Sequence, residues 1–275
     1  MTSASTIPLP TARESAGAFP VPREFPRRIV CQKIALAIPT LCEAGNLPVL
    51  LDRVRAILDR LHFDYEILIV DDDSCDGTAE IVSAIAQQDP RVRLLVRKGQ
   101  RGLSGAILHG WENTDADVIG VMDADLQHPP ELLAELTNAI SSGCDLVIGS
   151  RYTRGGGLGE WHAFRKLLSA AAVWATWPIQ RVGLRAKDPM SGFFFVRRDC
   201  LDGIVFQQTG FKLLLEILVR ARISSVREIP FAFGQRYRGA SKANVKVAID
   251  YGRLLARLYR SRFGFSRVIT DSAFD

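Results

Sequence analysis

Two aspartates, Asp123 and Asp125, follow directly on an apolar run that begins at Val118. Such a run is typical of a buried parallel strand, and side chains one residue apart on an extended backbone point to the same side. Two anions held that close repel each other unless a cation lies between them or one is protonated. Because hard oxygen ligands suit Mg²⁺ and Mn²⁺, the pair predicts a divalent-metal site. A strand that ends in an acidic helix cap is the simpler alternative.

A second group of acids, Asp71 to Asp73, ends another apolar run, and Pro39, Leu41 and Glu43 lie at the end of the first such run. In an open parallel sheet the ligand crevice lies outside the carboxyl ends of the strands. One of these acids could therefore accept hydrogen bonds from the edge of a uracil or guanine base. A turn closed by an Asx cap is the structural alternative for Asp71 to Asp73.

Glycine-rich phosphate motifs are absent from the sequence. No G-x-G-x-x-G follows the first apolar run, and G-x-x-x-x-G-K-[ST] occurs nowhere. Both observations disfavour a dinucleotide-dependent dehydrogenase and a P-loop kinase. A nucleotide held at acidic strand ends through a metal ion fits the sequence better, which favours a nucleotide-sugar site over a nicotinamide site.

The elements that must position these acids alternate regularly along the first half of the chain. The predicted strands are Lys33–Thr40, Tyr65–Asp73, Val92–Lys98, Val118–Met122 and Cys144–Tyr152. The predicted helices are Ala44–Leu61, Thr78–Gln88, Leu103–Glu112 and a segment after Pro130. This alternation predicts βαβ units and an α/β fold with a parallel sheet. Right-handed crossovers then place the loops after the strands along one edge of the sheet.

The pattern changes after Arg154. Gly155 to Gly157 and Gly159 predict a flexible link that could act as a lid. A helix with three tryptophans follows, and such residues are more often core residues than membrane contacts, although its basic ends suit an interface. Two strands, Met190–Asp199 and Val226–Gly234, are predicted to flank a helix from Phe211 to Arg222. The tryptophans are Trp161, Trp174 and Trp177.

Composition divides the chain into three parts. Residues 1–31 hold five of the 13 prolines and predict a disordered leader. Residues 32–241 form the predicted α/β domain, and residues 242–275 form a basic amphipathic helix and tail, helical from Lys242 to about Arg262. Between Gln235 and Arg267, nine Lys and Arg face one acid, which suits phosphates, anionic lipid or nucleic acid.

No membrane-spanning segment and no disulfide framework are predicted. The longest uncharged run, Leu167–Gln180, has 14 residues and contains Pro178, whereas a span needs about 20 apolar residues. The five cysteines are scattered and lack C-x-x-C spacing, which favours reduced thiols in a cytoplasmic protein over a zinc site. The protein is expected to be soluble or to lie on a membrane surface.

Several motifs occur in a characteristic order from Ile38 to Lys242: IPTLCEAGNLPVLL, VDDDSCDGTAE, GLSGAILHGW, MDADLQHPPE, IGSRY, DPMSGFFFVRR and RYRGASK. In these motifs the chain resembles the family 2 glycosyltransferases of the dolichol-phosphate (polyprenol-phosphate) mannosyltransferase type. The resemblance implies a GT-A fold, a Rossmann-like, mostly parallel open sheet with helices on both faces. It also implies a hexosyltransferase with a nucleotide-sugar donor, a divalent metal (Mg²⁺ or Mn²⁺) and a polyprenyl or dolichyl monophosphate acceptor at the membrane.

The resemblance also assigns roles to residues at matching positions. The implied metal ligands are Asp123, Asp125 and Gln127. The donor site is implied to comprise Pro39, Leu41, Glu43, Ile69, Asp71, Asp123, Ala124, Arg236 and Lys242, the last two in a loop that closes on the diphosphate. Arg151 and Arg165 resemble the arginines that hold the acceptor phosphate, and Asp125 and Arg151 the catalytic pair. Leu41 stands where the family usually has tyrosine, so stacking on the base or ribose is not expected there.

A lipid phosphate is already an anion, so the implied reaction needs no general base. It is a single in-line displacement that inverts an α-linked donor to a β-linked product, and His128 is interpreted as a neighbour of the metal loop rather than as a base. The overall resemblance favours GDP-mannose, while relatives that use UDP-glucose, UDP-GlcNAc or UDP-galactose share the same motifs. The expected location is peripheral, on the cytoplasmic face of a membrane, through its own helices or a membrane-anchoring partner protein. No nucleic-acid partner is expected.

Two other functions compete with this interpretation. Processive polysaccharide synthases share the aspartates but carry a Q-x-x-R-W signature and transmembrane helices, whereas Gln235 to Gly239 reads QRYRG. A non-catalytic protein of the same fold could bind polyanions or lipid through the basic tail. Metal-dependent sugar transfer that is lost in Asp125→Ala distinguishes an enzyme from such a binding protein.

Overall fold

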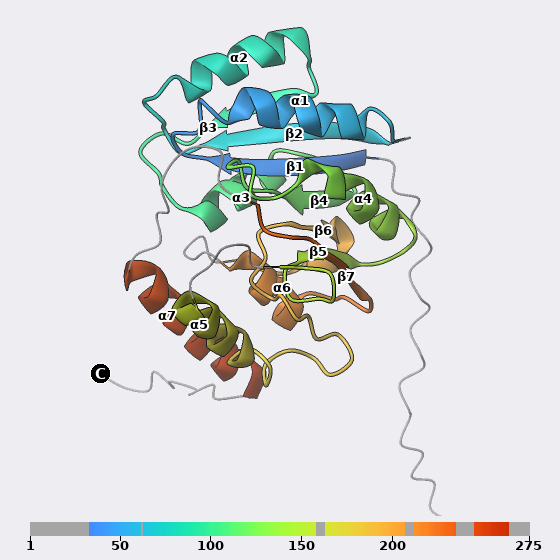
Figure 1. Cartoon of the computed structure of the whole chain (residues 1–275), viewed down its shortest axis with the longest axis vertical. Coiled ribbons are helices and arrows are strands. Elements are labelled where there is room, and N and C mark those ends of the chain that lie inside the picture. The colour runs from blue at the N-terminus through green and yellow to red at the C-terminus, as the bar shows by residue number, and fades with distance from the viewer. Residues whose placement is uncertain (1–32, 62, 158–162, 207–211, 235–244, 264–275) are drawn as a thin grey trace, which may run out of the picture.

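The computed structural model describes residues 33–61, 63–157, 163–206, 212–234 and 245–263; for 163–168 and 245–248 it describes the backbone alone. Seven strands form one sheet in the order β3-β2-β1-β4-β6-β5-β7. The strands are β1 (Lys33–Thr40), β2 (Asp64–Asp71), β3 (Val92–Val96), β4 (Val118–Val121), β5 (Leu146–Ser150), β6 (Phe194–Arg197) and β7 (Val226–Pro230). This is the predicted α/β architecture, with slightly shorter strands (Figure 1).

Helices cover both faces of this sheet. They are α1 (Leu47–Leu58), α2 (Thr78–Gln88), α3 (Leu103–Glu112), α4 (Leu133–Ser141), α5 (Ala163–Trp174), α6 (Leu213–Arg220) and α7 (Val245–Phe263), with 3₁₀ turns η1 (Pro130–Leu132) and η2 (Arg198–Leu201). Alternate side chains of β1 belong to two separate hydrophobic cores. Ile34, Leu36 and Ile38 pack with α1, α2 and α4, whereas Ala35 and Ala37 pack with α3 and α6. A sheet buried on both faces explains why its strands are continuous apolar runs.

The strand order changes direction between β1 and β4. β1 pairs in parallel with β2 on one side and with β4 on the other, so the loops after these strands diverge at this point. In open α/β sheets a ligand crevice lies at such a switch point, outside the carboxyl ends of the strands. The structure therefore places Asp123 and Asp125, which follow β4, at the expected edge.

One strand departs from the parallel arrangement. β6 runs antiparallel between β4 and β5, with Phe194 opposite both Val121 and Ile148. Its beginning therefore lies where β4 and β5 end, and the preceding segment enters the site edge. The strands of the predicted βαβ units, β1 to β5, all run in one direction, and β6 lies outside those units. Gly120 of β4 is necessary for this packing, because an added Cβ would lie 2.3 Å from the ring of Phe195.

The C-terminal helix belongs to the folded body. Leu254 and Leu258 of α7 pack against Leu215 and Val219 of α6. The hydroxyl of Tyr251 donates to the carbonyl of Ala172 in α5. Helix α7 lies alongside α5 (Figure 1). The helix predicted from Lys242 to about Arg262 is observed as α7, and its apolar residues explain this docking.

One prediction in the second half needs correction. The tryptophan-rich helix ends at Trp174, because Pro178 cannot donate a backbone hydrogen bond, and turns follow. Within the predicted flexible link, Gly157 forms a β-bridge with Ala232 and donates its N–H to the carbonyl of Phe231. Backbone groups at the end of β7 are satisfied by this bridge. Gly159 lies outside the described residues.

Two simpler expectations concern the membrane and the thiols. Among the described helices, none combines the length and the apolar character needed to cross a membrane. The described cysteines, Cys42, Cys75, Cys144 and Cys200, are all free thiols, as predicted. Cys31 lies outside the described part of the chain.

Candidate active site

The acidic loop after β4 is a turn rather than an extended strand end. β4 stops at Val121, and Leu126 adopts a positive φ of 63°. The Oδ1 atom of Asp125 accepts a hydrogen bond from the backbone N–H of Gln127 at 3.1 Å, which closes an Asx turn. The geometry assumed from the sequence, two acids on one extended strand, is therefore wrong. Asp125 and Ala124 are buried, whereas the side chain of Asp123 keeps a third of its surface exposed.

His128 fixes the backbone of this loop. Its Nδ1 atom accepts the N–H of Asp123 at 3.2 Å, so the proton of the neutral ring is on Nε2. The ring stacks on Phe193 at 5.0 Å between centroids and meets the edges of Phe231 and Phe233. Burial lowers the pKa of His128 to about 4. The imidazole is therefore uncharged at neutral pH and holds the acidic loop in place.

Gln127 links the acidic loop to the end of β7. Its Nε2 atom donates to the carbonyl of Gly234 at 3.1 Å, and the N–H of Gly234 donates to the carbonyl of Gln127 at 3.0 Å. Gly234 immediately precedes the segment that carries Arg236 and Lys242. Those two predicted donor residues lie outside the described part of the chain.

Gly192, just before β6, allows the closest approach to the acidic loop. A Cβ added there would lie 3.2 Å from both carboxylate oxygens of Asp123 and 3.4 Å from Cε1 of His128. A side chain at this position would need one of these groups to shift by a few tenths of an ångström. Glycine therefore leaves room for close packing here, a role that the single sequence did not reveal.

The acids at the end of β2 already have hydrogen-bond or salt-bridge partners within the protein. Asp71 is fully buried and accepts hydrogen bonds from the hydroxyl of Thr40 and from both the N–H and the hydroxyl of Ser74. Asp72 pairs with Arg97 at 2.7 Å and accepts the N–H of Gly102. Burial raises the pKa of Asp72, and these two partners oppose the shift. The acids thus fasten the loops after β1, β2 and β3 to one another.

The remaining predicted donor residues differ in their access to a ligand. Leu41 and Glu43 are half-buried beyond β1, and an Oε atom of Glu43 accepts the side-chain N–H of Asn46. The side chains of Pro39 and Ile69 are buried, and Ile69 belongs to the core that α1 covers. The side chain of Ile69 is therefore packed in this core.

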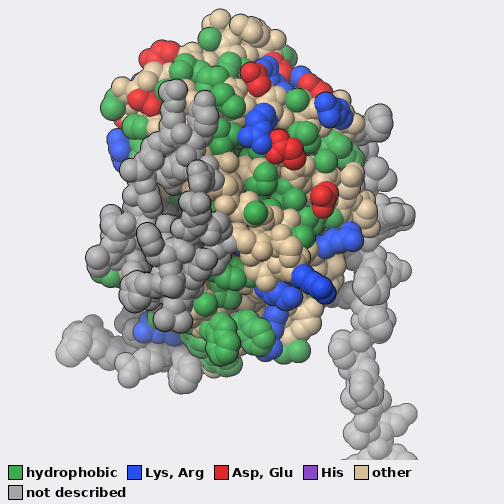
Figure 2. All heavy atoms as spheres, in the orientation of Figure 1, with side chains coloured by type: hydrophobic (Ala, Val, Ile, Leu, Met, Phe, Trp, Pro, Cys, Tyr) green, Lys and Arg blue, Asp and Glu red, His purple; other side chains and the backbone are tan. Residues whose placement is uncertain are grey.

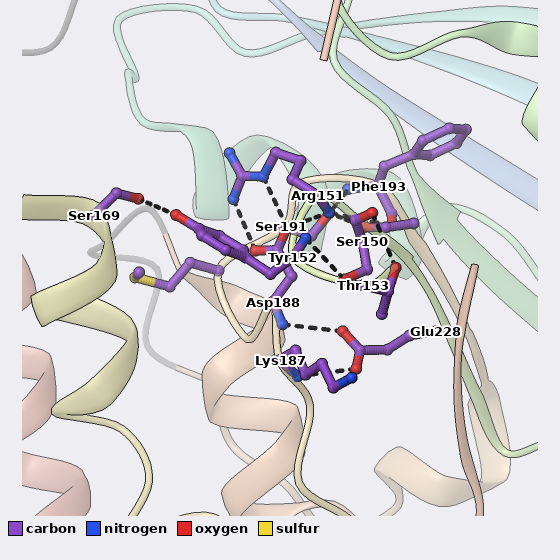
Figure 3. A network of polar contacts seen from close by, with 12 residues as sticks. Ser150, Arg151, Tyr152, Thr153, Ser169, Lys187, Asp188, Ser191, Phe193 and Glu228 are labelled. Atoms are coloured by element: carbon purple, nitrogen blue, oxygen red, sulfur yellow. Dashed lines mark hydrogen bonds and ion pairs between the residues drawn. The ribbon is translucent and has the colours of Figure 1, made fainter. Parts of the chain in front are cut away.

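After β5, Arg151 is held by a buried acid that the sequence reasoning did not single out. Its Nε and Nη2 atoms donate to the two carboxylate oxygens of Asp188 at 2.7 and 2.8 Å, and its backbone N–H donates to the same group (Figure 3). Burial opposes the charge of Arg151, but the hydrogen bonds to Asp188 raise its pKa. Glu228 of β7 in turn accepts the N–H groups of Lys187 and Asp188.

Two more polar groups lie near this pair. The hydroxyls of Tyr152 and Ser169 are 2.6 Å apart, which joins the residue after Arg151 to α5. Lys212, the residue before α6, donates to the carbonyl of Met190 at 3.4 Å. Arg165 is on α5, but its side chain lies outside the described part. Asp188 lies within the motif DPMSGFFFVRR, whereas the residues around Glu228 and Lys212 do not indicate a role for either.

The site combines acids on one side with cations on the other. No group of three His, Cys, Asp or Glu side chains in a metal-binding arrangement occurs among the described residues. Two carboxylates and one amide are nevertheless a fitting protein contribution for Mg²⁺ or Mn²⁺, since such ions are often bound by one or two carboxylates plus substrate phosphates. The exposed part of Asp123 gives that ligand set an open side.

An open, mostly parallel sheet with acids at its switch point is the architecture of a nucleotide-binding α/β enzyme. A model described as glycosyl transferase family 2 matches residues 36–205, and the chain therefore belongs to this family. It is 40% identical over 244 residues to a dolichol-phosphate mannosyltransferase of Pyrococcus furiosus, which covers 87% of this chain and 67% of the relative. It is 34% identical to the polyprenol monophosphomannose synthase of Mycolicibacterium smegmatis, covering 84% and 91%.

Solved structures show the same fold at low sequence identity. Mannosyl-3-phosphoglycerate synthase from Rubrobacter xylanophilus superposes with a TM-score of 0.66 at 18% identity, covering 89% of this chain and 79% of that one. Glucosyl-3-phosphoglycerate synthase from Mycobacterium tuberculosis, in complex with Mn²⁺, UDP and glucosyl-3-phosphoglycerate, gives a TM-score of 0.60 at 20% identity, covering 86% and 82%. The predicted GT-A fold is thereby confirmed.

Proposed function

We propose that this chain is an inverting mannosyltransferase that moves mannose from GDP-mannose to a polyprenyl or dolichyl monophosphate. Family membership and relatives named for mannosyl transfer to dolichol or polyprenol phosphate support the reaction. The observation that carries it is the meeting of two groups at one sheet edge, the acidic loop after β4 and the Arg151–Asp188 pair after β5. The first suits a metal-bound diphosphate, and the second suits an incoming phosphate.

The donor binds at the acidic half of this edge. Asp123, Asp125 and the side-chain oxygen of Gln127 are the groups that would hold a divalent ion, which when bound neutralises charge on the leaving diphosphate. Arg236 and Lys242 would add positive charge from the segment after Gly234. The loops fastened by Asp71 and Asp72 would surround the nucleotide.

The acceptor binds at the cationic half. Arg151, held by Asp188, presents a guanidinium of fixed orientation, a geometry that suits a phosphate, and Arg165 would approach from α5. The lipid phosphate is an anion that attacks the anomeric carbon without losing a proton. His128 agrees with this mechanism, because its buried ring has a pKa of about 4 and its Nδ1 is occupied by Asp123.

A membrane-facing surface is available at the end of α5. Trp174 is 78% exposed, Trp177 50% and Val182 82%, so the expectation that these tryptophans are core residues is wrong for the two described. The guanidinium of Arg185 lies 5.2 Å from the ring centre of Trp177. Figure 2 shows hydrophobic side chains flanked by basic ones in this part of the molecule. Aromatic and basic residues together suit an anionic membrane interface, here the cytoplasmic face, with or without an anchoring partner protein.

The test is transfer of labelled mannose from GDP-mannose to polyprenyl phosphate with Mn²⁺. We expect a β-linked product, transfer that stops when the metal is chelated, and loss of transfer in Asp125→Ala but not in Asp202→Ala, an exposed aspartate elsewhere. A thermal-shift series with GDP-mannose and UDP-sugars tests the donor. Stabilisation by UDP-sugars alone would replace GDP-mannose by a UDP-sugar, and full transfer by Asp125→Ala would refute the proposed site.

A further inference from the structure

Lys212 is a second cation beside Arg151. Its Nζ atom donates to the carbonyl of Met190 at 3.4 Å. Met190 lies in the short turn between Asp188, which binds Arg151, and Ser191, whose hydroxyl donates to the carbonyl of Gly149 (Figure 3). The turn that orients Arg151 therefore also positions the ammonium group of Lys212.

The charge balance of this corner depends on Lys212. Arg151 forms a bidentate pair with Asp188, which is fully buried, so the two charges largely cancel. Within the described residues, Lys212 forms no salt bridge with a carboxylate, and the long hydrogen bond to Met190 leaves most of its donor capacity unused. A phosphate monoester carries a charge of about −1.5 to −2 near pH 7. The Arg151–Asp188 pair alone does not balance that charge.

The position of Lys212 is unfavourable without an anion. Burial and the neighbouring positive charge of Arg151 lower the pKa of Lys212, while Asp123 and Asp188 act in the opposite direction. A cation that is only half-exposed and lies close to another cation is destabilised relative to one in water. Groups kept in such a state are characteristic of sites where a ligand supplies the missing charge.

We propose that Lys212 is a phosphate-binding residue of this active site. Its ammonium group binds a phosphate oxyanion of the reactants, beside Arg151. Its neighbour Arg151, which follows β5, favours the acceptor monophosphate as the ligand. The interaction of Lys212 with Asp123 makes the donor diphosphate the second source of the same chemistry. This inference rests on the proposed function for the identity of the reactants, but anion binding by Lys212 can be measured without any transfer.

The experiment compares the full-length protein with Lys212→Met, which removes the charge, and Lys212→Arg, which keeps it. Lys187→Met is the matched control, because Lys187 is an exposed lysine next to Asp188. The first measurement is binding of inorganic phosphate and pyrophosphate by calorimetry, with thermal unfolding to verify the fold. We expect affinity to fall roughly tenfold or more in Lys212→Met, to remain within about threefold in Lys212→Arg, and to be unchanged in Lys187→Met.

Steady-state kinetics then identify the phosphate. A KM that rises for polyprenyl phosphate alone assigns Lys212 to the acceptor, and one that rises for the nucleotide-sugar alone assigns it to the donor. Unchanged anion affinity in a folded Lys212→Met variant would overturn the proposal, and so would equal losses in Lys212→Arg. If Lys212→Met does not fold, Lys212→Gln takes its place. Absence of transfer in the wild type, with anion binding that still depends on Lys212, would refute the proposed function alone.

Discussion

The two halves of the site edge achieve charge balance in different ways. After β2, Asp71 is satisfied by hydroxyl and backbone donors and Asp72 by Arg97 and a backbone N–H. After β5, Arg151 is paired with one buried acid, and Lys212 contacts a carbonyl oxygen. The proposed donor half is thus rich in acids, of which those after β2 already have partners, whereas the proposed acceptor half carries two cations and one buried acid. In the proposed reaction, this division would let two phosphate-bearing substrates meet without sharing one set of ligands.

The largest stability effect is expected at the acceptor half, in Asp188→Asn. This change keeps the shape but leaves Arg151, whose side chain is only 11% exposed, without its counter-charge. Breaking a buried pair in this way costs about 3–5 kcal/mol of unfolding free energy. Denaturant unfolding measures the loss. Asp115→Asn, which alters an exposed pair with Lys33, is the control and should change stability little. Equal effects of the two changes would show that the buried pair does not organise this half.

The next effect is the pH dependence of stability that comes from His128, the residue that joins the acidic loop to its aromatic neighbours. The pKa of His128 is about 4 in the folded protein against 6.5 in an unfolded chain, so the unfolded state binds its proton more readily. The uncharged imidazole therefore contributes up to roughly 3 kcal/mol to the free energy of unfolding. This contribution is complete above pH 6.5 and is lost as the pH falls towards 4.

Unfolding free energies at pH 7 and pH 4.5 measure this dependence. His128→Asn should lower the free energy of unfolding at pH 7 and remove the part of the acid sensitivity that comes from His128. His109→Asn, at a partly exposed histidine on α3, should retain it. An identical acid profile in wild type and His128→Asn would contradict the burial of an uncharged imidazole.

A smaller effect is expected at the donor half, in Asp71→Asn. The amide keeps one acceptor oxygen but places an NH₂ group where the carboxylate accepted the N–H or the hydroxyl of Ser74. Losing one such bond in a buried position costs about 1–3 kcal/mol. Donor-nucleotide affinity should fall with stability, while the KM for the acceptor should not. A selective rise in the acceptor KM would contradict the division of the site.

Sequence periodicity predicted most of the sheet, because both faces are covered and each central strand is an apolar run. The residues of the acidic loop could also be predicted from the sequence, since they are neighbours in the chain. The cationic half was not, because Asp188 binds Arg151 across 37 positions and Glu228 binds Asp188 across 40. Nothing local marks such partners, and the antiparallel direction of β6, which brings them together, has no signature of its own.

Resemblance to a family also does not tell whether the side chain of a matched residue reaches the site. Ile69 matches a donor-site position, yet its side chain is fully buried in the core. The two tryptophans at the end of α5 show the reverse case. Residue type alone favoured burial, whereas both side chains are exposed.

The division into a donor half and an acceptor half is tested most directly by calorimetry of nucleotide-sugar binding with Mn²⁺. The comparison is between wild type, Asp125→Ala and Arg151→Lys, which keeps the buried charge but not the bidentate pair. We predict that Asp125→Ala weakens donor binding roughly tenfold or more, while Arg151→Lys stays within about twofold yet transfers poorly. Donor binding that survives in Asp125→Ala, or that is lost equally in Arg151→Lys, would contradict it.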